Sequence, residues 1–379
     1  MCATLNDWYE RWIFCTYQST PTNLALYRIA FACVLIVAEP PLTLWIKAFP
    51  DSFFAPPMGI MRFLHGFPPA AFFYALNCAT MLALACVLFG YRTRLASIGL
   101  AAALLVSYAW TYSLGKIDHD TILFVVIPLI LAFSSWGSAL SLDSRRAQTT
   151  SPLLSAWPIC LVMLLTACAM AFSGVAKASA GWLDPSTYSA RGYVARAMDD
   201  SGQFTPLGPL LIDIDAVWWI ADFAIVGVEV GLLIALPWRR AMQIACALAG
   251  VFHVMVYLLL GIQPFTANLM AYALLIDWER LWRSQPMRSL EATLRPWTRA
   301  IRAWHALGVG FLLFTTNVVI GNVVWKALSL VHRSGEQAFV FLELAIVLVV
   351  SVSYLLLVAG RLVIRLAYSL VHPSVARHS

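Results

Sequence analysis

Residues 153–176 read LLSAWPICLVMLLTACAMAFSGVA, an apolar stretch without a single charged side chain. A helix needs about 20 such residues to cross the hydrocarbon core of a membrane, so this stretch is long enough to span it. The next residues, 177–182, read KASAGW. Desolvation makes a lysine this close to hydrocarbon release its proton more readily. We therefore expect Lys177 to act as a base near neutral pH.

Similar apolar stretches recur along the whole chain. Of its 379 residues, 61% are hydrophobic and 12% are charged, about half the charge of an ordinary soluble domain. The sequence predicts an all-α, polytopic transmembrane helix bundle of about ten spans, preceded by a short interfacial helix over residues 5–17. The predicted spans are Leu24–Trp45, Ala70–Tyr91, Leu95–Tyr112, Thr121–Leu140, Leu153–Ala176, Ala216–Leu236, Met242–Leu260, Thr266–Ile276, Ala306–Leu330 and Ala338–Val358.

The basic residues predict the orientation of these spans. Arg and Lys are more numerous in the loops after even-numbered spans, the C-terminal tail and the N-terminal segment taken together, with 16, than in the opposite loops, with 7. Cytoplasmic loops carry this excess, so we expect a multi-pass protein of the cell membrane, in contact with lipids, with both termini in the cytoplasm. Lys177 and His119 would then face the exterior. The net charge of +6 reflects this topology, and no basic stripe indicates a nucleic-acid partner.

Two regions follow from this layout. Residues 1–280 form the predicted transmembrane domain with its N-terminal interfacial helix. Residues 281–379 hold a cytoplasmic basic loop, two further spans and a short tail. The exterior segment 177–215 is long for a simple connector and could cap a cavity. None of the eight cysteines lies in a C-x-x-C pair, so we predict neither a disulfide framework nor a metal site.

Four ionisable residues lie well inside the predicted spans: Arg28, Asp222, Glu229 and His253. Such residues are costly in lipid and are functional candidates by default. Asp222 and Glu229 are seven residues apart and share a helix face. Glu229 and His253 lie at similar depth on consecutive helices and could share a proton. We expect an outward-facing polar cavity lined by these residues, with the exception of Arg28, and by His119 and Lys177.

Each position also has a purely structural interpretation. Arg28 and Lys177 could extend to lipid phosphates as ordinary basic side chains at span ends. Glu229 and His253 could form a hydrogen-bonded pair that only locks two helices together. The sequence Asp118-His119-Asp120 could cap a helix, and Glu343 could pair with Lys326.

Several motifs, taken in order, carry a resemblance to a known family. Residues 173–182 read SGVAKASAGW, with a small residue and glycine before the lysine and a tryptophan five residues after it. Arg28 in an early helix, Asp118-His119-Asp120 before an apolar run that ends at Asp143, and Glu229 with Phe252-His253 follow the same pattern. The region 15–280 resembles the vitamin K-dependent gamma-carboxylases and their bacterial HTTM (horizontally transferred transmembrane) relatives.

The resemblance implies specific roles. Lys177 matches the base that deprotonates vitamin K hydroquinone, and His119 matches a histidine that supports the carbanion chemistry. Trp182, Arg28, Asp222, Glu229 and His253 would then line the cavity for substrate and cofactor. A reduced quinone is the implied cofactor, no metal is implied, and a secreted peptide or protein is the implied substrate of a carboxylase-type lyase.

The sequence also departs from the carboxylases. Ala176 stands where they have a second lysine, and two predicted spans with a basic tail follow residue 280 instead of a large exterior domain. A second function therefore stays open: a non-enzymatic accessory protein for the maturation or export of a secreted peptide, as in short HTTM proteins of a toxin system. A transporter is a third possibility, but no inverted repeat supports it.

Overall fold

The computed structural model describes residues 5–57, 59–116, 121–145, 155–200, 205–262, 265–284, 302–319 and 332–371. These residues form helices joined by turns, and no β-strand element occurs among them. His119 and Lys326, which the sequence analysis singled out, lie outside the described residues, as does the side chain of Glu343.

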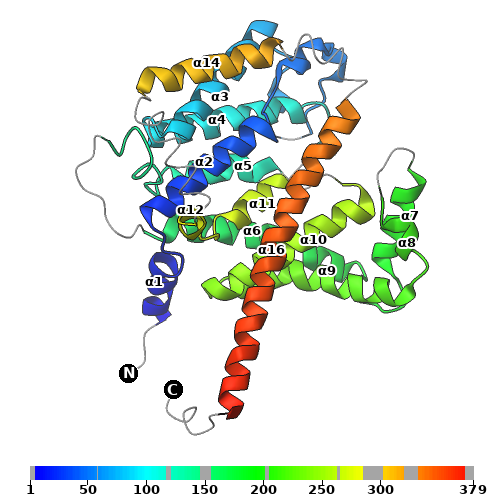
Figure 1. The fold of residues 1–379 in the computed structure, drawn as a ribbon. Coiled ribbons are helices and arrows are strands. Elements are labelled where there is room, and N and C mark those ends of the chain that lie inside the picture. Colours follow the sequence, from blue (N-terminus) through cyan, green and yellow to red (C-terminus); the bar gives the residue numbers. More distant parts are fainter. Residues whose placement is uncertain are drawn as a thin grey trace. The chain divides into compact units, whose positions relative to one another are not determined.

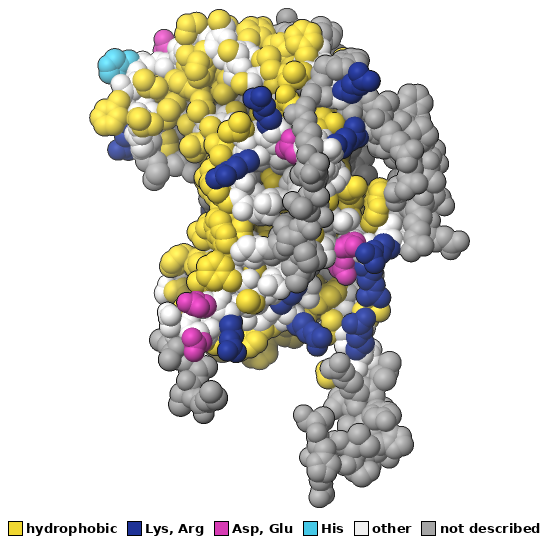
Figure 2. Space-filling view, turned by 90° about the vertical axis from the view of Figure 1, so that its left-hand side faces the viewer, with side chains coloured by type: hydrophobic (Ala, Val, Ile, Leu, Met, Phe, Trp, Pro, Cys, Tyr) yellow, Lys and Arg dark blue, Asp and Glu magenta, His cyan; other side chains and the backbone are white. Residues whose placement is uncertain are grey.

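Within the described residues, six helical segments are long and apolar enough to cross a membrane: α3 (Ala70–Phe89), α4 (Thr93–Tyr112), α6 (Trp157–Ser179), α9 (Asp215–Ala235), α10 (Arg239–Leu260), and Leu344–Val363 within α16 (His332–Val371). Large apolar side chains on them are exposed, for example Phe172 at 74%. Hydrophobic side chains also cover broad areas of the face shown in Figure 2. Because lipid is the natural neighbour of such surfaces, the chain is an all-helical, multi-pass membrane protein.

Several predicted spans are shorter in the structure. Helix α2 (Pro21–Val37) ends well before the predicted Trp45, because Pro40 and Pro41 cannot continue a helix. Helix α5 (Ile122–Leu131) contains Pro128 and gives way to turns from Ala132 onward. Helices α11 (Thr266–Ala273) and α14 (Ala303–Val319) are also shorter than a full span. The predicted total of about ten spans stays a prediction.

The chain forms two compact units, of which the first comprises Met1–Thr166 and Phe265–Glu336. Helix α3 packs against α2, α4 and α14 (Figure 1). Helix α5 packs against α4 and α11, and the short helix α12 (Trp278–Trp282) packs against α2. The 3₁₀ segments Leu44–Ala48, Asp51–Phe53 and Ile60–Phe63 lie within the connection between α2 and α3. The short helix predicted over residues 5–17 is present as α1 (Leu5–Cys15), and its interfacial position stays a prediction.

The second unit comprises Ala167–Pro264 and Gln337–Ser379. Helix α9 packs against α10, and α7 (Ser189–Asp199) contacts both, while the short α8 (Gly208–Leu211) adjoins α7 and α10. The buried Trp218 holds this end of the unit together, and its indole N–H donates to the carbonyl of Leu211 at 3.0 Å. Helix α16 meets α10 through Gly250, where an added Cβ would lie 2.6 Å from the hydroxyl of Ser351. This unit contains Lys177, Asp222, Glu229 and His253.

Candidate functional site

A lysine–glutamate pair is the centre of the candidate site. The Nζ of Lys177 on α6 lies 2.5 Å from Oε1 of Glu229 on α9. It also donates to the hydroxyl of Ser173, one helical turn earlier, at 2.7 Å, and that hydroxyl in turn donates to Oε1 of Glu229 at 3.2 Å. The side chain of Lys177 is 25% exposed and that of Glu229 only 4%. The pair thus joins a buried carboxylate to an amine that solvent or a ligand can reach.

Gly174 allows the two helices to come close enough for this pair. A Cβ added at Gly174 would lie 2.9 Å from Cγ2 of Val230 and 3.0 Å from Cβ of Glu229. Only glycine lets α6 approach α9 so closely at this level, as small residues commonly do between membrane helices. Ser173, Gly174 and Lys177 therefore have linked roles. Gly174 lets α6 approach α9, and this approach brings Ser173 and Lys177 within hydrogen-bond distance of Glu229.

The turn after α6 brings an aromatic ring to the lysine. Gly181 has a φ of +89°, a left-handed conformation that ends the helix without steric cost. The N–H of Trp182 then donates back to the carbonyl of Lys177 at 3.2 Å, a bond of the Schellman type. The indole ring of Trp182 lies with its centroid 5.7 Å from the Nζ of Lys177, within cation–π range. Trp182 also packs on Tyr193 of α7, with 5.5 Å between ring centroids.

The second oxygen of Glu229 is an available acceptor. Its Oε2 is buried and has no hydrogen-bond partner within the described part of the chain. Leaving a buried carboxylate oxygen unpaired is costly, so this atom is suited to accept a hydrogen bond from a bound hydroxyl or amide.

The predicted Glu229–His253 pair is replaced by the Lys177–Glu229 pair. His253 is buried on α10, with its ring 5.2 Å from that of Phe252. The hydrogen bonds of Glu229 run instead to Lys177 and Ser173. Depth alone suggested the histidine, but the packing of α6 on α9 at Gly174 selects the lysine.

Asp222 holds α7 in place. Its two carboxylate oxygens accept the N–H groups of Ser189 and Ala190, each at 2.8 Å. These are the first N–H groups of α7, which no residue inside that helix can satisfy. Arg191, the next residue of α7, pairs with Asp215 at 2.8 Å. Asp222 was predicted to line a cavity; its observed contacts anchor the start of α7 to α9.

Arg28 belongs to the first unit and does not reach out to lipid. Its side chain is fully buried, which contradicts the interpretation of an arginine that extends to lipid phosphates. Its guanidinium donates to the carbonyls of Trp136 at 2.9 Å and Leu140 at 2.6 Å. Arg28 thus fixes the turns that follow α5.

Sequence reasoning missed three residues that shape the site. Ser173 was quoted without a role, although its position one turn before Lys177 is the spacing of side chains that meet on a helix. Gly174 was quoted as part of the motif, but its role in the close approach of α6 to α9 was not predicted. Tyr193 carried no sequence signal, because only the turn at Gly181 brings Trp182 to it.

Chemically, the cluster is an acid–base pair beside an aromatic wall. Lys177 and Glu229 can exchange a proton between themselves, and together they can accept one more from a ligand. Within the described ranges no group of three or more His, Cys, Asp or Glu side chains is arranged to hold a metal ion.

Comparison with known proteins gives one match. The sequence model of the HTTM domain matches residues 17–282, well over half of the chain. No curated protein and no solved structure matches significantly. The matched range contains the Lys177–Glu229 pair, Trp182 and Arg28.

Proposed function

The chain belongs to the HTTM domain family, and we propose that it is a membrane-embedded acid–base enzyme in which Lys177 and Glu229 together remove a proton from a reduced quinone at the outer membrane face. This is chemistry of the kind carried out by the vitamin K-dependent gamma-carboxylases. One observation carries the proposal: a buried carboxylate is shared with a reachable lysine, and its second oxygen is left available.

The proton count of the pair supports a role as base. In the resting state one proton lies between Lys177 and Glu229, either as ammonium and carboxylate or as amine and carboxylic acid. The pair accepts one further proton when both groups become protonated. The pair then carries a positive net charge and lies beside the deprotonated substrate, which is negatively charged. That charge match stabilises the product of proton removal in a site with little water.

The surroundings of the pair fit a reduced quinone. Oε2 of Glu229 can accept the hydrogen bond of a hydroxyl group, and the indole of Trp182 offers a flat face beside Lys177. A reduced quinone supplies an acidic hydroxyl group and reducing electrons when bound. The contribution of the protein is to orient that hydroxyl, to take its proton and to hold the ring against the aromatic side chains.

A second candidate function is an accessory role in the maturation or export of a secreted peptide. The segment 177–215 favours it, because Asp222 and Asp215 anchor this segment while Tyr193, Leu210 and Ile214 stay exposed. An apolar surface of this kind can receive a peptide without any reaction at Lys177.

Oxygen-dependent consumption of a reduced naphthoquinone tests the first proposal. The full chain is purified in lipid nanodiscs, and the wild type is compared with Lys177→Ala and Glu229→Gln. We expect each variant to lose at least about 100-fold in rate, the usual contribution of a positioned acid or base.

Lys47→Ala provides the matched control, because this lysine lies in the first unit, away from Glu229 in the second, and donates to the hydroxyl of Tyr74. It should consume quinol at the wild-type rate. If the wild type consumes none, or if Lys177→Ala equals the wild type, the enzyme proposal is refuted. Retention of peptide maturation by Lys177→Ala would then favour the accessory role.

A further inference from the structure

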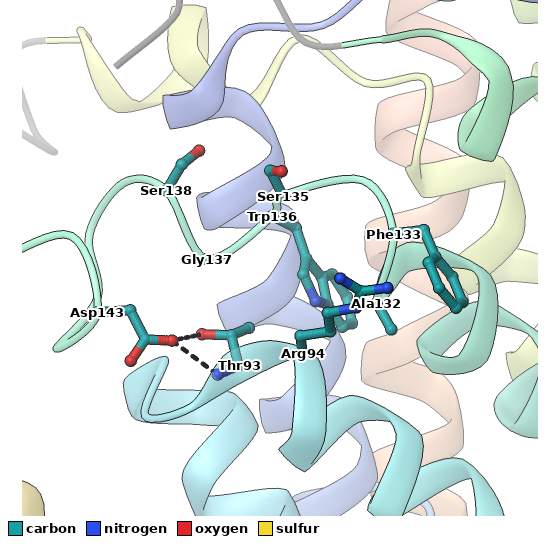
Figure 3. A pocket seen from close by; sticks show the side chains of 9 residues that line it. All are labelled: Thr93, Arg94, Ala132, Phe133, Ser135, Trp136, Gly137, Ser138 and Asp143. Atoms are coloured by element: carbon teal, nitrogen blue, oxygen red, sulfur yellow. Dashed lines mark hydrogen bonds between the residues drawn. The ribbon is translucent and has the colours of Figure 1, made fainter. Parts of the chain in front are cut away.

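We propose that a pocket at the start of α4 binds the phosphate group of an anionic lipid. The pocket lies wholly in the first unit, has a volume of about 270 Å³ and is lined by residues of α4 and of the turns after α5, including Thr93, Arg94, Phe133, Ser135, Ser138 and Asp143 (Figure 3). It shares no residue with the Lys177–Glu229 pair, so the two proposals stand or fall separately.

The wall of the pocket is held in place from three directions. Arg28 donates to the carbonyls of Trp136 and Leu140. Asp143 accepts from the backbone N–H of Arg92 and from the N–H and hydroxyl of Thr93, at 2.7–2.8 Å. At the third point, Gly137 is so close to Thr93 that an added Cβ would lie 2.4 Å from the threonine hydroxyl. A ligand therefore meets a site that is already formed, which lowers the cost of binding.

Arg94 is the main donor. Its side chain is exposed and lies over the ring of Phe133, 4.8 Å from the centroid. Among the described residues it has no hydrogen bond or ion pair, in contrast to Arg28, so its N–H groups remain available. A guanidinium offers paired donors that match two phosphate oxygens, and stacking on Phe133 fixes its plane.

Two serine hydroxyls add to this donor set. The Oγ of Ser138 is buried without a hydrogen-bond partner in the described part of the chain. Ser135, with a φ of +58°, is exposed on the same turn. Figure 3 shows both on the loop that also carries Trp136, with Arg94 beside that tryptophan. Rotation of the Ser138 side chain toward the pocket would let its hydroxyl donate to a phosphate oxygen and gain the partner that it lacks.

The charge of the region favours an anion. Arg94 lines the pocket together with Asp143, Arg92 donates its backbone N–H to Asp143, and Arg28 interacts with Asp143 electrostatically. Both oxygens of Asp143 already accept hydrogen bonds from the first residues of α4, so its charge is partly compensated. The excess of arginine attracts an anion, and the hydrogen bonds that Asp143 accepts keep its carboxylate from competing for Arg94.

The place of the pocket points to a lipid as the source of the phosphate. Arg94 is the second residue of α4, a helix long enough to span the membrane, so the pocket lies where lipid head groups lie. A volume of about 270 Å³ falls just below the range of ~300–1,000 Å³ that is usual for small-molecule sites. It suits a head group whose acyl chains stay in the bilayer.

Native mass spectrometry of the full chain tests this proposal. The protein is exchanged into nanodiscs that contain phosphatidylglycerol or phosphatidylcholine, and retained lipid is counted. We expect the wild type to retain phosphatidylglycerol preferentially. Arg94→Gln should weaken that retention by about tenfold, the value of one hydrogen bond to a charged group, and Ser138→Ala should weaken it less.

Arg240→Gln is the matched control, because Arg240 is also the exposed second residue of a spanning helix, α10. If Arg94→Gln and Arg240→Gln lower retention equally, the effect is general surface charge and the proposal is wrong. Equal retention of both lipids by the wild type overturns it as well. Displacement of the lipid by millimolar inorganic phosphate would identify a soluble phosphate compound as the ligand and refute the lipid assignment. Unchanged thermal unfolding of Ser138→Ala excludes misfolding as the cause of its loss.

Discussion

Arg28 and Lys177 are both cations within apolar helices, and their surroundings differ in kind. Arg28 is fully buried and donates to backbone carbonyls, which stay acceptors at every pH. Lys177 is partly exposed and faces a carboxylate, which can take up a proton. The first arrangement can only hold a loop, whereas the second can exchange protons. For a cation in an apolar helix, the chemical nature of its hydrogen-bond partner therefore distinguishes a structural role from a chemical role better than its depth in the membrane does.

The largest expected effect concerns the stability supplied by Arg28. Arg28→Met should lower the free energy of unfolding by about 3 kcal/mol or more, because the carbonyls of Trp136 and Leu140 lose their donor. Arg28→Lys should recover part of this loss, since one ammonium replaces a forked donor. The unfolding midpoint in detergent measures both. Lys177→Ala combined with Glu229→Gln, which leaves no buried carboxylate without its cation, should lose less stability than Arg28→Met. An equal loss in the two proteins would contradict the difference between the two cations.

A smaller effect is expected where α6 meets α9. Gly174→Ala places a methyl group 2.9 Å from Cγ2 of Val230 and 3.0 Å from Cβ of Glu229, so the helices must separate. Overpacking of this kind costs about 1–3 kcal/mol, and quinol consumption should fall with it because Lys177 moves away from Glu229. Gly227→Ala on α9 is the control, because its added Cβ would meet no atom within 4 Å. A Gly174→Ala protein with full activity would show that the close approach is not needed.

The smallest expected effect is a pH dependence outside the membrane helices. The hydroxyl of Thr20, 2.6 Å from Oε2 of Glu279, lowers the pKa of Glu279, and Arg283 adds to this. A lowered pKa in the folded state means that this carboxylate stabilises the fold above the pKa of an unfolded glutamate. The contribution disappears as pH falls through the folded-state value. We expect Glu279→Gln to flatten the acid side of the stability curve by less than about 1 kcal/mol.

Acid titration of the unfolding midpoint measures this effect. Glu10→Gln on the exposed face of α1 serves as the control and should keep the wild-type slope. Identical slopes for Glu279→Gln and the wild type would mean that the Thr20–Glu279 contact does not persist in solution.

The sequence predicted the class of the protein and its family, but it did not predict which side chains form hydrogen bonds with one another in the site. Apolar runs predicted the membrane helices, and the motif around Lys177 predicted the family that the match over residues 17–282 confirms. Helix ends were less predictable, because Pro40 and Pro128 cut into runs whose composition alone looks continuous. Hydropathy does not register such backbone constraints.

The contacts of the ionisable residues depended on packing. Glu229 pairs with Lys177 because Gly174 lets α6 and α9 pack closely. Counting residues along each helix predicts the depth of a side chain but not which neighbouring helix it contacts. Asp222 faces the start of α7 because Tyr188 turns the chain with a φ of +43°. The sequence left open whether Arg28 extends to lipid phosphates or lines a cavity, and in the structure it donates to carbonyls of the turns after α5. His119 stays a prediction.

The length of helix α16 implies that part of it extends beyond the membrane. Its 40 residues extend about 60 Å at 1.5 Å per residue, twice the ~30 Å thickness of the hydrocarbon core. Upright, the helix must stand out of the bilayer for about half of its length. A fluorophore placed near Arg361 or beyond would then move as part of a continuous rigid rod, and its distance from the lipid surface would report the tilt of the helix directly.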